Sequence, residues 1–180
     1  MLAGVSAEPA DPRTRSQKVT HAVFGVGGGV ASVVYGTVVV MATVTAAYAT
    51  ETHPWKLTLL VWITVLVLWI AHLYAHGLSH SLEHRRTLGR ADALGIAQRE
   101  IGILVAAAAP TAALLLGAAG IMHESAAIWL ALATGLVILG VEGIRYARLE
   151  DFGTTATVVA VCLNVALGLF VVALKVLVAH

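Results

Sequence analysis

The stretch Leu57–Leu82, LTLLVWITVLVLWIAHLYAHGLSHSL, contains 26 residues without a single Asp, Glu, Lys or Arg. A helix of roughly 20 apolar residues is long enough to cross the hydrocarbon core of a bilayer, which is about 30 Å thick. Inside lipid, a chain must satisfy its own backbone polar groups, and a helix does so within one segment. The stretch is therefore predicted to be a transmembrane helix.

Four more uncharged stretches surround this one. They are Val19–Thr50 with 32 residues, Ile101–His123 with 23, Ser125–Val141 with 17 and Phe152–Leu174 with 23. The first contains a run of glycines that disfavours a helix, so its crossing is placed later, and the short fourth stretch is extended to Arg145. The sequence thus predicts an all-α fold, a membrane bundle of five transmembrane helices.

The predicted domain organisation is simple. Residues 1–18, with Pro9 and Pro12, are expected to form a disordered cytoplasmic tail, and residues 19–180 a single transmembrane domain. The expected spans are about 30–48, 57–78, 101–121, 126–145 and 154–177.

Composition excludes several other classes of protein. Hydrophobic residues make up 59% of the chain and charged residues only 12%, about half of what a soluble domain carries. With one cysteine, Cys162, the chain cannot form an internal disulfide or a thiolate metal cluster. Its length leaves no room for a separate catalytic module, so no enzyme activity is expected. The basic residues are attributed to membrane topology, and nucleic acid is not an expected partner.

The basic residues fall in alternate gaps between the stretches. Nine of the eleven lie before the first span, between the second and third, or between the fourth and fifth, and only Lys56 and Lys175 lie elsewhere. Short loops rich in Lys and Arg stay in the cytoplasm. The N-terminus is therefore predicted to be inside and the C-terminus outside.

Small and polar residues mark expected contacts between helices. Small side chains at four-residue spacing let two helices approach closely, and an amide inside lipid needs a hydrogen-bond partner. We expect these contacts within the chain or between the subunits of a homo-oligomer. The residues are Gly25, Gly29, Ala127, Ala131, Gly135 and Asn164.

A ladder of histidines lies near the inner end of the second span. His72, His76, His80 and His84 follow one another at intervals of four residues, each step rotating by about 40° around the helix. Neighbouring members can share a site, whereas all four cannot. His72 and His76 are expected inside the membrane, and His80 and His84 in the interface.

Two carboxylates are expected at the same depth as the histidines. Glu100 opens the third span and Glu142 lies about one turn inside the end of the fourth. Ionised groups in a span are costly, and they usually face the bundle interior, a cavity or one another. His72, His76, Glu100 and Glu142 are therefore the candidate residues for handling protons or small cations.

Several interpretations of these residues stay open from the sequence. Imidazole titrates near neutral pH, which suits a proton site, and His72, His76 and Glu142 could also hold a divalent metal ion. Haem would need axial ligands on facing helices, for which His21 and His76 are the inner candidates. Alternatively, Glu142 pairs with Arg145 and Glu100 pairs with Arg99 or a lipid headgroup. The protein would then be a non-catalytic subunit or interaction protein of a larger membrane complex.

One short stretch resembles a known family of channels. Trp69-Ile70-Ala71-His72, followed by Tyr74 and His76, resembles the Trp-x-x-His stretch in the second helix of lysosomal-type potassium channels and their bacterial relatives. The first-helix signature of that family, an Arg followed by Phe-Ser-Asp-Gly, is absent, as is a sixth span. No pore residues are carried over.

The chain as a whole resembles small, uncharacterised polytopic membrane proteins of high-GC bacteria. The likeness lies in Val34-Tyr35-Gly36-Thr37 and the stretch Trp69–His76. This resemblance implies a bacterial inner membrane location and no particular activity.

Overall fold

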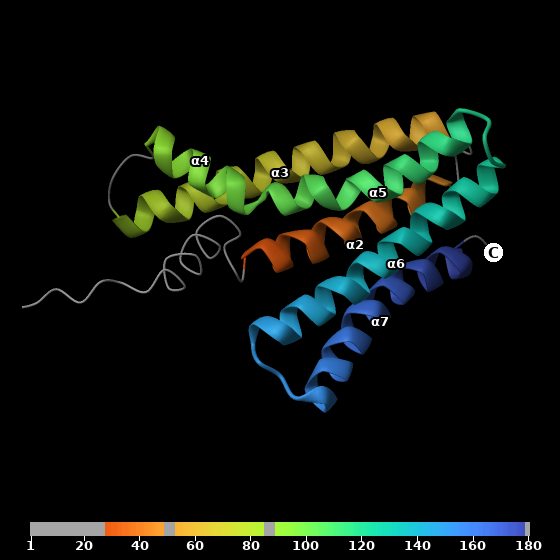
Figure 1. Cartoon of the computed structure of the whole chain (residues 1–180). Helices are drawn as coiled ribbons and strands as arrows, with labels where there is room; N and C mark the ends of the chain where they lie inside the picture. Colours follow the sequence, from red (N-terminus) through yellow and green to blue (C-terminus); the bar gives the residue numbers. More distant parts are fainter. Residues whose placement is uncertain (1–27, 49–52, 85–88, 179–180) are drawn as a thin grey trace, which may run out of the picture.

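The computed structural model describes residues 28–48, 53–84 and 89–178. The described part is helical and contains no strand (Figure 1). Its helices are α2 (Gly28–Tyr48), α3 (Pro54–His84), α4 (Arg90–Arg99), α5 (Ile101–Ala118), α6 (Glu124–Leu149) and α7 (Thr154–Val178). Residues 1–18, His21 and Gly25, which carried sequence-based predictions, lie outside the described residues.

In the described part of the chain, five segments are long and apolar enough to cross a membrane. They are Gly29–Tyr48, Pro54–Leu82, Arg90–Ala118, Glu124–Leu149 and Thr154–Ala173. The predicted fold class is confirmed in its architecture, an all-α bundle of five long apolar helices. The chain has the build of a multi-pass membrane protein.

The third span differs from the expectation at its start. The region before Ile101 was expected to be a loop, but it forms the helix α4, which leads into α5 through a break at Glu100 (φ −89°, ψ 1°). The backbone N–H of Gly89 donates to the Asp92 carboxylate at 3.2 Å, and Arg99 lies in the last turn. An acidic first turn and a basic last turn both complement the helix dipole, which favours a helix despite the charges.

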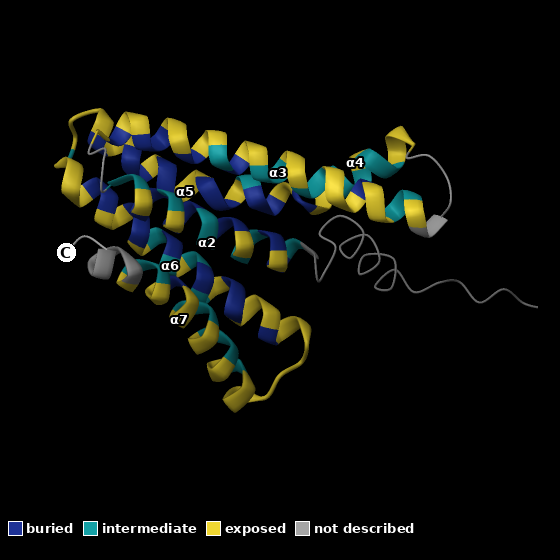
Figure 2. Cartoon of the chain, turned by 180° about the vertical axis from the view of Figure 1, so that it is seen from behind, coloured by how far each residue is buried: buried dark blue, intermediate teal, exposed yellow. Residues whose placement is uncertain are grey.

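Helix α2 lies at the centre of the bundle. It packs against α3 and α5 on one side and against α6 and α7 on the other (Figure 1). Its inward residues Val40, Met41 and Val44 are at most 1% exposed and belong to one apolar core shared by the helices. Helices α3 and α7 are the least buried of the five spans (Figure 2). Large exposed apolar side chains, which can contact lipid, lie on both of them and also on α5 and α6.

Glycines bring the backbones of α2 and α5 together. A Cβ atom built on Gly36 would lie 2.9 Å from Ile103 Cα, and one on Gly102 would lie 3.1 Å from the backbone nitrogen of Val33. Any side chain at either position would have to push backbone atoms aside. The two helices can therefore pack this closely only because both positions are glycine.

The predicted small-residue stripe on α6 faces the interior of the chain. Ala127 and Ala131 are at most 1% exposed, and a Cβ on Gly135 would lie 2.7 Å from Met41 of α2. The stripe was expected to make contacts either within the chain or between subunits, and in the structure it makes them within the chain. The stripe is therefore not available to join subunits.

Candidate functional site

Glu100 is a buried carboxylate at the break between α4 and α5. The residue is 8% exposed, and its Oε2 accepts a 2.8 Å hydrogen bond from the hydroxyl of Ser32 on α2. Ser32 itself is 6% exposed, and its Oγ also lies 3.4 Å from the carbonyl oxygen of Arg99. The close approach of α2 and α5 at Gly102 is what lets a side chain as short as serine reach the carboxylate.

His76 of α3 lies on the other side of the same carboxylate. Its Nδ1 is 3.7 Å from Glu100 Oε1 and 3.1 Å from the carbonyl oxygen of His72. A carbonyl oxygen can only accept, so the hydrogen bond requires the proton on Nδ1. In the neutral ring, Nε2 is then left with its lone pair and can accept a proton.

His72 is held in the same way one turn earlier. Its Nδ1 lies 3.2 Å from the carbonyl oxygen of Leu68, which again leaves the lone pair on Nε2. The His72 ring packs between Tyr35 of α2, with ring centroids 5.0 Å apart, and His76, at 6.1 Å. We call Ser32, Tyr35, His72, His76 and Glu100 the His–Glu cluster.

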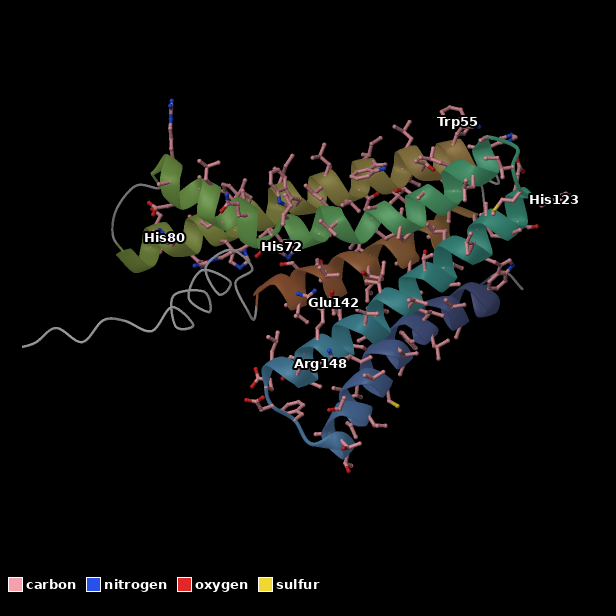
Figure 3. The ribbon with its side chains drawn as sticks, in the orientation of Figure 1. Trp55, His72, His80, His123, Glu142 and Arg148 are labelled. Atoms are coloured by element: carbon pink, nitrogen blue, oxygen red, sulfur yellow. The ribbon has the colours of Figure 1, made fainter. Side chains whose placement is uncertain are left out.

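Glu142 belongs to a second cluster across α2. It is 5% exposed, and its Oε1 accepts a 2.6 Å hydrogen bond from Nη1 of Arg145, one turn further along α6. Its Oε2 is buried and has no hydrogen-bond partner among the described residues. Figure 3 shows Glu142 on α6 and His72 on α3, with α2 between them.

The four residues that the sequence grouped together therefore lie in two separate places. His72, His76 and Glu100 come together, whereas Glu142 makes no hydrogen bond or ion pair with any of them within the described part of the chain. In residues 28–48, 53–84 and 89–178, no group of three or more His, Cys, Asp or Glu side chains could hold a metal ion. The set His72, His76 and Glu142 is accordingly not assembled as a metal site.

Asn164 and Gly29 occupy positions beside two separate cavities. Asn164 of α7 lines a cavity of about 290 Å³ between α2, α6 and α7, and no hydrogen bond joins its amide to another described residue. The partner expected for it on another helix is thus not found in this part of the chain. Gly29 lines a different cavity, together with Arg99 and Arg145.

A second His–Glu pair lies at the opposite end of the bundle. His53 Nδ1, before α3, is 3.4 Å from Glu124 Oε1 at the start of α6, and the two side chains are 58% and 49% exposed. Both residues precede long apolar helices, so their common depth could be read from the sequence. Their contact depends on how α3 and α6 are placed around the bundle, for which the sequence has no signal.

The layer between the two ends is largely apolar, with a few buried threonines. Apart from Glu100 and Glu142, the buried residues in the described ranges are uncharged. Thr37 and Thr111, which are buried there, donate to carbonyl oxygens of their own helices at 2.7 and 2.6 Å. In the described part of one chain, no buried charged side chain continues the His–Glu cluster toward the other end.

Sequence reasoning missed Ser32 and Tyr35 as members of the His–Glu cluster. Ser32 lies one helical turn before Gly36, and a small polar residue beside a helix-contact glycine is the signal that could have found it.

No protein family, curated protein or solved structure matches this chain.

Proposed function

We propose that the His–Glu cluster binds and releases a proton or a small cation at one boundary of the membrane. The observation that carries this proposal is a buried carboxylate, Glu100, with a half-exposed imidazole, His76, 3.7 Å from one oxygen and a hydroxyl donor on the other. Ionisable groups inside a membrane bundle are energetically costly. Where they occur, they usually pair with one another or serve such a role.

The geometry supports proton binding in a definite sequence. A proton from water adds to the Nε2 lone pair of His76, whose side chain is 55% exposed. Nδ1 keeps its proton and its 3.1 Å hydrogen bond to the carbonyl oxygen of His72. The positive ring then lies beside the carboxyl group of Glu100, and release of the proton reverses the step.

For transport, this proton or cation would also have to pass the apolar layer. Because that layer has no buried charge in the described chain, passage requires a second conformation or an assembly of several copies. We propose a homo-oligomer in contact through the outward apolar faces of α3 and α7. No catalytic step is part of the proposal.

The same apolar layer favours a second candidate function. A chain with an apolar interior and broad apolar faces on α3 and α7 suits a non-catalytic subunit that packs against other membrane proteins. In that case the His–Glu cluster stabilises the junction of α2, α3 and α5 and moves no ion.

The proposed location is the bacterial cytoplasmic membrane, with the N-terminus inside and the C-terminus outside. The support is the distribution of Arg and Lys over alternate gaps. Reporter fusions after Arg90 and after His180 test this orientation. A cytoplasmic signal at His180 would reverse it and place the His–Glu cluster at the outer boundary.

Flux measurements on reconstituted protein distinguish the two candidate functions. Proteoliposomes loaded with a pH-sensitive dye, and separately with potassium or sodium indicators, should show flux for the wild type. The flux should be abolished in His76→Ala and in Glu100→Gln. Glu124→Gln is the matched control, because it neutralises the exposed partner of His53 at the other end.

The outcome decides between the candidates as follows. Flux that is lost at the His–Glu cluster and kept in Glu124→Gln supports proton or cation handling. Wild-type vesicles that pass no ion over a range of pH and voltage would overturn it and leave the subunit function.

A further inference from the structure

A cavity at the charged end of the bundle has the chemistry of an anion site. It lies between α2, the junction of α4 and α5, and α6, and has a volume of about 180 Å³. Its polar lining consists of Arg99, Arg145 and Gln98, and its apolar lining includes Val33, Ile101 and Val105. Neither proton handling nor a subunit role accounts for this combination.

Both charged residues that line the cavity are basic. Arg145 donates one N–H to Glu142 at 2.6 Å, which offsets its charge but leaves the other donors of the guanidinium for a ligand. Arg99 makes no ion pair with a carboxylate in the described part of the chain. The neighbouring Glu100 directs its oxygens to Ser32 and His76 instead.

The apolar part of the lining points to the membrane. Ile101 and Val105 are 50% and 59% exposed. They lie one helical turn apart on α5, and Val105 is the one further into the span. On α6, Val141 and Val137, 49% and 65% exposed, continue in the same direction from Arg145. A ligand held by the arginines would therefore have an apolar surface beside it.

We propose that this cavity binds the phosphate group of an anionic glycerophospholipid, with Arg99 and Arg145 as its donors. Guanidinium groups bind phosphate through paired hydrogen bonds, and basic pockets between membrane helices suit lipid headgroups. The acyl chains lie along the exposed apolar residues of α5 and α6. Free inorganic phosphate shares the headgroup chemistry and lacks the acyl chains, so the two sources can be separated.

The test measures lipid that stays bound to the full-length protein. The protein is reconstituted in equal parts of phosphatidylglycerol and phosphatidylcholine, extracted into neutral detergent, and analysed by native mass spectrometry. The wild type should retain phosphatidylglycerol in preference to phosphatidylcholine. Arg99→Gln should weaken that retention about fivefold, since a basic residue near anionic lipid contributes roughly that factor.

Two further variants separate binding from folding. Arg145→Gln combined with Glu142→Gln removes the charge pair without leaving one partner alone, and it should weaken retention by a similar factor. Arg148→Gln is the matched control, because Arg148 lies one turn from Arg145 at the same end and does not line the cavity (Figure 3). Thermal unfolding shows whether each variant is folded.

Each result supports or overturns the proposal. The lipid site is established if bound phosphatidylglycerol resists excess inorganic phosphate and its retention falls in Arg99→Gln but not in Arg148→Gln. Binding of inorganic phosphate alone, with full displacement of the lipid, assigns the same donors to free phosphate and overturns the lipid assignment. Equal retention of both lipids, or equal losses in Arg99→Gln and Arg148→Gln, would overturn the site itself.

Discussion

The two buried carboxylates, Glu100 and Glu142, are stabilised in opposite ways on the two sides of α2. Glu100 is bound by residues of other helices, Ser32 at 2.8 Å and His76 at 3.7 Å. Glu142 is bound by Arg145 on its own helix and has one oxygen without a partner in the described chain. One site depends on how three helices pack, and the other mainly on a single turn of helix.

Because their partners differ, the carboxylates of Glu100 and Glu142 are suited to different roles. A carboxylate bound between helices couples the positions of α2, α3 and α5 to the charge of His76. A carboxylate bound within one helix is neutralised locally, as charged residues in membrane spans commonly are. The His–Glu cluster is therefore the better candidate for function, and Glu142 for the local neutralisation of Arg145.

The substitution with the largest expected effect disrupts the packing of α2 against α5. Gly36→Ala places a Cβ 2.9 Å from Ile103 Cα, so α2 must move from α5 and the Ser32–Glu100 hydrogen bond is lost. We expect a loss of about 3 kcal/mol in the free energy of unfolding, measured by denaturation in nanodiscs. Gly95→Ala is the control, since nothing lies within 4 Å of its Cβ. Equal stabilities of the two variants would contradict the close packing of α2 on α5.

The substitution with the next largest expected effect tests the Glu142–Arg145 pair on α6. Arg145→Ala removes the hydrogen-bond partner of a carboxylate that is 5% exposed. Losing a hydrogen bond to a charged group costs about 2 kcal/mol, which thermal unfolding should detect. Adding Glu142→Gln should recover much of the loss, because no unpaired charge is then buried. A double variant as unstable as Arg145→Ala would show that the charge of Glu142 is not the cause.

Ser32→Ala is expected to have a smaller effect than Arg145→Ala. It removes the hydroxyl that donates to Glu100 Oε2, at a cost of about 1.5 kcal/mol in the free energy of unfolding. Combined with Glu100→Gln, the two losses should not add, because both substitutions disrupt the same hydrogen bond. Additive losses, measured as a double-mutant cycle, would place Ser32 outside the His–Glu cluster.

The five spans could be predicted from the sequence because lipid imposes a local rule. An uncharged stretch of sufficient length, such as Leu57–Leu82, must become a helix whatever surrounds it. Helix α4 was missed because Arg90, Asp92 and Arg99 resemble a charged loop. Asp92 in the first turn and Arg99 in the last turn, both favourable with the helix dipole, were the available signal for a helix.

The candidate site was only half predictable, for a geometric reason. Position along the sequence indicates the depth of a residue in the membrane, and Glu100 and His76, which were expected at one depth, lie 3.7 Å apart. It does not indicate the direction in which a helix faces, so Glu142 was grouped with histidines that lie across α2. Contacts such as that between Ser32 and Glu100, 68 residues apart, depend on the packing of whole helices.

The smallest expected effect on stability belongs to His76→Ala, and this substitution distinguishes function from packing most directly. The side chain is 55% exposed and lies 3.7 Å from Glu100, so the free energy of unfolding should fall by only about 0.5 kcal/mol. His53→Ala, which removes the exposed partner of Glu124 at the other end, should have a similarly small effect. If the His–Glu cluster handles protons, only His76→Ala should abolish proton flux in vesicles, although both variants remain folded. Equal flux in the two variants would show that the exposed imidazole beside Glu100 plays no greater part than the one beside Glu124.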